Sequence, residues 1–141
     1  MKKTTLLIVL MLFVTKTYSQ ARSELNFGLI GINYEIPVHK DITIAPGVST
    51  NFDLNWITLN VKANYYFDNL FKLTNESWDV YGGAGAGYAF YTGDNDKDSG
   101  FDIGLHVGGR WFWNEKWGIY LEIGGASTQG ATGGLGLTMK L

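Results

Sequence analysis

The chain has 141 residues with a formal net charge of −2, and it contains 19 glycines and no cysteine. Small exported domains often depend on disulfides, and the lack of cysteine excludes that source of stability. Aromatic residues make up 15% of the chain. So many aromatic residues beside so many glycines are unusual for a soluble domain, in which glycine averages about 7%.

The N-terminal segment has the organisation of a secretory signal peptide. Lys2 and Lys3 are followed by an apolar run of nine residues, and Ser19 is a small residue directly before the expected cleavage point. The apolar run is too short for a membrane-spanning helix, which needs about 20 residues. We therefore predict a signal peptide over residues 1–19 and a single domain over residues 20–141.

The charge of the predicted mature chain bears on its partners. Three of the 11 basic residues fall within the signal peptide, which leaves eight against 13 acidic residues, a net charge of −5. This balance argues against a nucleic-acid partner, because nucleic-acid phosphates require a basic protein surface.

Beyond the signal peptide the sequence predicts strands and no helix, because no stretch shows a sustained 3.6-residue period. Seven segments qualify as strands: residues 23–36, 41–50, 55–67, 78–91, 100–113, 118–127 and 131–141. Short links between them predict an antiparallel meander. The first segment breaks its alternation, so we expect a bulge near Gly28 or Gly31, and we expect Pro37 to end the segment.

The number of strands follows from the kind of barrel that the pattern suggests. Bacterial membrane barrels have an even number of strands. We therefore predict an all-β, antiparallel, up-and-down transmembrane barrel with eight strands. For that count, either residues 23–36 hold two short strands or the boundaries between residues 41 and 55 differ from those given above.

The alternation places an apolar face on one side of each strand. The opposite face is rich in Gly, Asn, Thr and Tyr and poor in charge, whereas a wetted surface is about 25–35% charged. Aromatic residues bracket the apolar face, from Trp78 to Phe90 and from Phe101 to Trp113. Each bracket corresponds to about 28 Å of height in a tilted strand, close to the apolar band of an outer-membrane barrel. We therefore predict an apolar, lipid-facing exterior, with a soluble lipocalin-like barrel as the alternative.

The chain resembles a known family of membrane proteins. The predicted signal peptide, the glycine-rich stretch over residues 80–88 and the last strand are similar to the small outer-membrane β-barrel proteins of Gram-negative bacteria, the OmpA/OmpX-like group. This resemblance implies eight antiparallel strands, insertion into the cell outer membrane by the barrel assembly machinery, and often no enzymatic activity. Leu141 departs from the group, in which the last strand commonly ends in Phe.

Charged residues on the inward face form the main candidate site. With a turn centred on Lys116, Arg110 is predicted to lie directly opposite Glu122. The same face also carries Asp102, His106 and Lys62. Buried charges must be paired, so these five residues are predicted to form a lumen polar network that either fills the barrel or gates it.

No catalytic, cofactor-binding or metal-ligating residue is predicted with a specific motif. Asp94, Asp96 and Asp98 resemble the start of a calcium loop, but the required Gly and Glu are replaced by Ser99 and Leu105. Only weak binding of a divalent cation is expected there.

The predicted function is correspondingly general. The expected protein is a small integral outer-membrane barrel in contact with outer-membrane lipid, with a structural or surface-interaction role and no enzymatic activity. The alternatives are a narrow, porin-like gated pore and a soluble periplasmic lipocalin-like barrel that binds a ligand.

Overall fold

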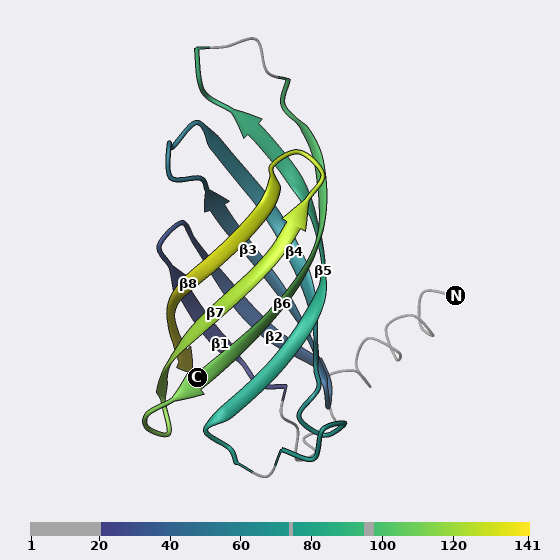
Figure 1. Ribbon diagram of the computed structural model, residues 1–141, viewed down its shortest axis with the longest axis vertical. Coiled ribbons are helices and arrows are strands. Elements are labelled where there is room, and N and C mark those ends of the chain that lie inside the picture. Colours follow the sequence, from purple (N-terminus) through teal and green to yellow (C-terminus); the bar gives the residue numbers. More distant parts are fainter. Residues whose placement is uncertain (1–20, 74, 95–97) are drawn as a thin grey trace, which may run out of the picture.

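The computed structural model of the protein describes residues 21–73, 75–94 and 98–141. Its strands are β1 (Glu24–Gly28), β2 (Gly31–His39), β3 (Ile42–Thr50), β4 (Trp56–Tyr66), β5 (Trp78–Tyr91), β6 (Gly100–Phe112), β7 (Trp117–Ala126) and β8 (Gly130–Lys140). Each strand pairs antiparallel with its sequence neighbour, and β8 pairs with β1 to close the sheet (Figure 1). The predicted eight-stranded, up-and-down barrel is confirmed. The described residues contain no helix with the length and apolarity needed to cross a membrane.

The barrel has two different ends. The lower end, at the bottom of Figure 1, carries the β4–β5 and β6–β7 connections and the C-terminus. The upper end carries the β3–β4, β5–β6 and β7–β8 connections. The predicted signal peptide, residues 1–19, lies outside the described residues.

In the N-terminal third the structure confirms the first of the two alternatives for an eight-strand count, and the expected bulge and the expected end at Pro37 are wrong. Residues 23–36 are two strands, β1 and β2, and the chain reverses at Leu29 and Ile30 where we expected a bulge. Pro37 does not end the segment, because β2 continues to His39 and its pairing with β3 shifts register between these two residues. A register irregularity is a position at which a strand tolerates proline, which cannot donate to the ladder.

The outward face of the barrel is a continuous apolar belt. Large exposed hydrophobic side chains alternate with buried or half-buried residues along the strands, and β1 and β8 contribute Phe27, Leu135 and Leu137. Among strand residues the most exposed large hydrophobic side chains are near the middle of β6, where Leu105 is 71% exposed, and at its upper end, where Phe101 is 83% exposed. A monomer in water rarely exposes a contiguous apolar patch of this extent, so the belt is suited to contact with lipid.

Aromatic side chains gather at both edges of the belt. The lower group contains the neighbouring pairs Tyr65–Phe67, Trp78–Trp111 and Trp111–Trp113, with ring centroids 5.2, 6.3 and 6.4 Å apart. The upper group contains Trp56–Tyr91, Tyr88–Phe90 and Tyr88–Phe101, with centroids 4.9, 4.9 and 5.4 Å apart. Two aromatic girdles that flank an apolar band are typical of membrane barrels.

Glycine allows the narrow barrel to hold large inward side chains. Gly108 of β6 pairs directly with Tyr81 of β5, and a Cβ on Gly108 would overlap the Tyr81 ring. Gly83 faces inward beside β4, and a Cβ there would overlap the carbonyl oxygen of Ala63. An eight-stranded barrel has room inside for little more than side chains, so these glycines give the tyrosine and the neighbouring backbone the space they need.

Candidate functional site

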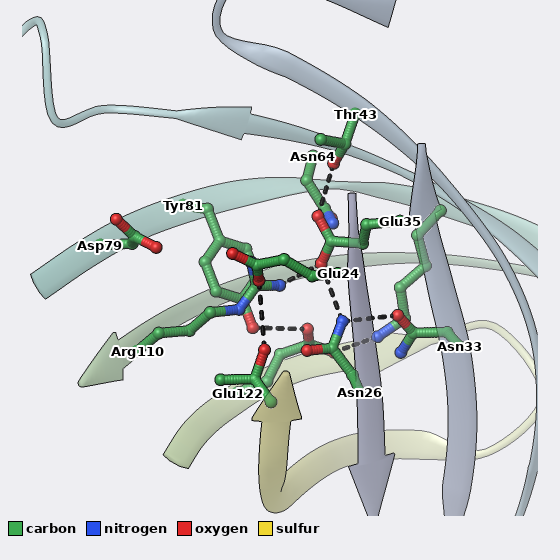
Figure 2. Close-up of polar contacts among 12 residues, drawn as sticks. Glu24, Asn26, Asn33, Glu35, Thr43, Asn64, Asp79, Tyr81, Arg110 and Glu122 are labelled. Atoms are coloured by element: carbon green, nitrogen blue, oxygen red, sulfur yellow. Dashed lines mark hydrogen bonds and ion pairs between the residues drawn. The ribbon is translucent and has the colours of Figure 1, made fainter. Parts of the chain in front are cut away.

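The lower half of the lumen is filled by a cluster of charged residues centred on Arg110. Arg110 comes from β6, is 2% exposed, and points toward Glu24 of β1 and Glu35 of β2 (Figure 2). Its Nη1 lies 2.6 Å from a Glu24 carboxylate oxygen, and its Nη2 contacts Glu35. The planar guanidinium can donate in several fixed directions at once, which allows one side chain to join three strands.

Glu35 receives further hydrogen bonds from hydroxyl and amide groups of neighbouring strands. Thr43 and Tyr66 donate to one of its carboxylate oxygens at 2.7 and 2.6 Å, and Asn26 donates to the other at 3.0 Å. Tyr66 also accepts a hydrogen bond from Arg110. A buried charge is stable only when it is paired and hydrogen-bonded, and Glu35 meets both conditions.

The cluster extends toward the lower mouth through a second arginine. Arg22 lies 2.6 Å from Glu24 and 2.6 Å from Asp79 of β5. The Arg110 guanidinium lies 4.4 Å from the centroid of the Tyr81 ring, a cation–π distance. Alternating charges and the flat face of Tyr81 thus fill the lower lumen, and we refer to Glu24, Glu35, Tyr66, Tyr81, Arg22, Asp79 and Arg110 as the lower plug.

The predicted pairing of Arg110 with Glu122 is wrong. Across the β6–β7 hairpin Arg110 faces Tyr120, and Glu122 faces Gly108, so the register is two residues away from the prediction. The Asn114 side chain accepts hydrogen bonds from the backbone of Lys116 and Trp117 at 2.8 and 2.7 Å, which moves the centre of the turn off Lys116. A shift of two residues leaves every side chain on its predicted face.

The remaining predicted residues lie higher in the lumen. Glu122 pairs with Lys62 of β4 and accepts a hydrogen bond from Tyr81 at 3.1 Å. His106 contacts Asn64 through its Nε2 at 2.6 Å. All of the predicted network residues therefore face the lumen, but they lie at different heights, and Tyr81 joins Glu122 to the lower plug.

Asp102 belongs to the upper mouth of the barrel. It accepts hydrogen bonds from the Ser127 hydroxyl, the Thr128 backbone and Gln129 at 3.1, 2.9 and 3.4 Å. Gln129 also donates to Thr58 on β4 at 3.1 Å. The β7–β8 turn is thereby tied across the upper lumen to the opposite wall.

Between the lower plug and this upper mouth lies a cavity of about 160 Å³. The Lys62–Glu122 pair and His106 contribute to its polar lining, and glycines of β5, β6, β7 and β8 form much of its wall. Asn33 and Asn60 also line it. The barrel interior is thus closed by salt bridges below and holds a small, mostly uncharged chamber above.

Most of the lower plug was missed by sequence reasoning. Glu24, Asn26, Asn33 and Glu35 alternate with apolar residues on either side of Leu29 and Ile30. That symmetry indicates a hairpin, but the turn itself consists of two large apolar residues, which carry no turn signal. The proposed cation loop at Asp94, Asp96 and Asp98 lies partly outside the described residues, which leave out 95–97.

Comparison with known proteins supports the fold. No protein-family model and no curated protein matches the chain. A solved structure described as "De novo design of transmembrane beta-barrels" is similar, with a TM-score of 0.56 and 10% sequence identity over 84% of this chain and 91% of that chain. At this identity the similarity concerns the fold alone: the chain has the architecture of an eight-stranded transmembrane β-barrel.

Proposed function

We propose that this protein is a small integral barrel of the bacterial outer membrane, exported by a cleaved signal peptide and inserted by the barrel assembly machinery. The observation that carries the proposal is the apolar belt between two aromatic groups, which surrounds a closed barrel. Its membership of the OmpA/OmpX-like group is part of this proposal and rests on the sequence resemblance.

The proposed role is structural or in surface interaction and involves no catalysis. The lower plug supports a role without steady transport, because Arg110, Glu24 and Glu35 are joined across the lumen by ion pairs. The gated-pore alternative assigned the gate to Arg110 and Glu122, which are not paired with each other in the described barrel. We also propose that any divalent cation bound at the loop containing Asp94 and Asp98 is held weakly.

Fractionation of the native envelope tests the proposal. We expect the protein in the outer-membrane fraction, extractable only by detergent, with the N-terminus of the mature chain near Gln20. Unboiled protein should migrate differently from boiled protein on a cold gel, because a closed barrel resists unfolding by detergent. Recovery of a folded species from the periplasm in plain buffer would favour the soluble lipocalin-like alternative and contradict the proposal.

Planar-bilayer recording distinguishes the plugged barrel from a pore. Purified protein with the lower plug intact should give no steady ion conductance. Stable conductance that disappears in Arg110→Leu would instead support a pore controlled by this residue.

A further inference from the structure

The wall of the barrel is incomplete above the β1–β2 hairpin. β1 has five residues and pairs with Gly136 to Lys140 of β8, and the Leu29 N–H donates to the Leu135 carbonyl oxygen at 3.1 Å. β8 continues upward to Gly130 beside β7 alone among the described strands. The β1–β2 turn therefore lies near the middle of β8, well below the other upper connections (Figure 1).

This gap forms a lateral opening in the upper half of the apolar belt. Its lower border is the β1–β2 turn at Leu29 and Ile30 together with the upper end of β3, where Thr50 donates to the Ile30 carbonyl oxygen at 2.7 Å. One side is residues 130–134 of β8, which pair with β7 alone among the described strands. Up to the hairpin, β1 and β2 fill the space between β8 and β3, which is three interstrand spacings or roughly 14 Å between strand axes. The opening lies above them.

The cavity in the upper lumen reaches this opening. Its lining includes Ile30 and Gly31 at the hairpin, residues 132–134 of β8 and residues 48–50 of β3, in addition to the inward-facing Asn60 and Lys62. Glycine at positions 31, 133 and 134 places no side chain in the passage. The interior chamber thus reaches the edge of the wall at the lateral opening.

The borders of the lateral opening are apolar outside and polar inside. Leu29, Ile32 and Val48 are exposed on the outer face beside the gap. In an antiparallel strand every second residue directs its backbone groups to the same side, so Ala131 and Gly133 present theirs to the opening, as Leu135 does lower down. Within a bilayer such backbone groups are tolerated only where they line a polar or water-filled space.

The charges that line the chamber favour a bound ligand whose polar head group carries no charge. Lys62 and Glu122 neutralise each other, while the Asp102 carboxylate at the upper mouth carries an additional negative charge. An anionic head would have no unpaired cation among the described lining residues and would be repelled by Asp102. Asn33, Asn60, Thr58 and Gln129 offer amide and hydroxyl groups that suit a hydroxyl-bearing head.

From this arrangement we propose that the upper lumen is a binding site for a single-chain amphiphile with an uncharged hydroxyl head, entered sideways from the membrane. The head lies in the chamber beside Asn33 and Asn60, and the aliphatic chain passes through the lateral opening onto Leu29, Ile32 and Val48. This inference rests on the proposed membrane location.

A photoreactive monoacylglycerol, with a diazirine close to its glycerol ester, tests the proposal in phosphatidylcholine vesicles that contain the folded full chain. Its long chain confines it to the bilayer, so it can reach the lumen only through the wall. We expect labelled Asn33 and Asn60 in addition to outward-facing belt residues. Labels on belt residues alone, in barrels shown by gel mobility to be folded and inserted, would overturn this inference and leave the proposed function intact. Failure to insert would contradict the proposed function itself.

Leucine substitutions at two glycines of β8 should obstruct the route through the lateral opening, and one at a glycine of β6 should not. A Cβ on Gly134 would meet the Tyr120 ring at 3.4 Å, and one on Gly133 would meet the Glu122 carbonyl at 3.5 Å, both ordinary contacts. Gly134→Leu should therefore fill the chamber and reduce lumen labelling to background. Gly133→Leu places its side chain on the outward face beside the opening, so it should narrow the opening from outside and reduce lumen labelling as well. Gly109→Leu, for which the nearest atom is the Asp79 carbonyl oxygen at 3.6 Å, faces away from the cavity and serves as the control.

Lumen labelling that persists in both folded Gly134→Leu and Gly133→Leu would overturn the proposal. So would stronger labelling by a fatty acid that carries the same diazirine, because it would contradict an uncharged head.

Discussion

Replacement of Arg110 by leucine removes the cation that the lower plug surrounds. Glu24 retains Arg22 at 2.6 Å, whereas Glu35, 1% exposed, loses the arginine that neutralises it. Breaking a buried ion pair by removal of one partner costs about 3–5 kcal/mol, because a charge is left buried without compensation. Arg110→Leu should therefore lower the free energy of unfolding by about that amount.

The double variant Arg110→Leu/Glu35→Gln separates charge from packing. The glutamine amide that it introduces would carry no charge and could still accept hydrogen bonds from Thr43 and Tyr66, so we expect the double variant to recover a large part of the lost stability. Urea-induced unfolding in phosphatidylcholine vesicles, followed by tryptophan fluorescence, measures both values. Lys62→Met is the control in the more open upper lumen, where the expected cost is about 1 kcal/mol. A cost for Arg110→Leu no larger than that of the control, or an absence of rescue, would refute this reasoning.

Three further predictions concern the belt, the lower loop and the wall. Leu105→Arg in the middle of the belt should lower the free energy of unfolding by about 2–4 kcal/mol, and Leu70→Arg in the β4–β5 connection by about 0–1 kcal/mol. The two leucines are similarly exposed, at 71% and 65%, so only contact with lipid distinguishes them. Equal losses in vesicle unfolding would contradict a lipid-facing belt. Burial raises the pKa of the Asp68 carboxyl, which accepts the Val80 N–H at 2.8 Å. The folded state therefore binds the proton more tightly than the unfolded state, and stability falls as pH rises through the raised pKa. Asp68→Asn should be more stable than the parent at neutral pH and should lose that advantage in acid. Urea titrations at several pH values measure the difference in free energy of unfolding between variant and parent, and a difference that does not change with pH would be inconsistent with this cause. Gly83→Ala should lower the free energy of unfolding by about 1–3 kcal/mol through overpacking. Gly85→Ala, whose Cβ would meet Lys62 at 3.3 Å, should lower it by less. The same unfolding assay compares the two variants, and the reverse order would argue against crowding at Gly83.

The sequence predicts the barrel well where its alternation is long and uninterrupted. In β5 and β6 the period of two extends over most of the strand, and the predicted ranges 78–91 and 100–113 agree with the observed strands to within one residue. Alternation also assigns Arg110, His106 and Lys62 to the lumen. These are consequences of strand geometry, in which successive side chains point to opposite faces.

Partner choice within the lumen could not be predicted from the same pattern. Residues 110 and 122 share a face under either register, so face assignment contains no information on a shift of two residues. The actual partners, Glu24 and Glu35, come from strands far away in the sequence that meet Arg110 only when the barrel closes. Two short strands over residues 23–36 remained one of two alternatives in the sequence, because the apolar residues Leu29 and Ile30 at the reversal resemble the interior of a strand. The lateral opening could not be predicted for the same reason.

Depth-resolved quenching of the native tryptophans tests most directly whether lipid surrounds the belt. All five tryptophans lie at strand ends or in the adjoining turn: Trp56, Trp78, Trp111, Trp113 and Trp117. In vesicles of brominated phosphatidylcholine, bromines near the glycerol ester should quench them more strongly than bromines near the chain ends, and Leu105→Trp should add fluorescence that chain-end bromines quench. Equal fluorescence in brominated and unbrominated vesicles, with the barrel folded, would contradict the account.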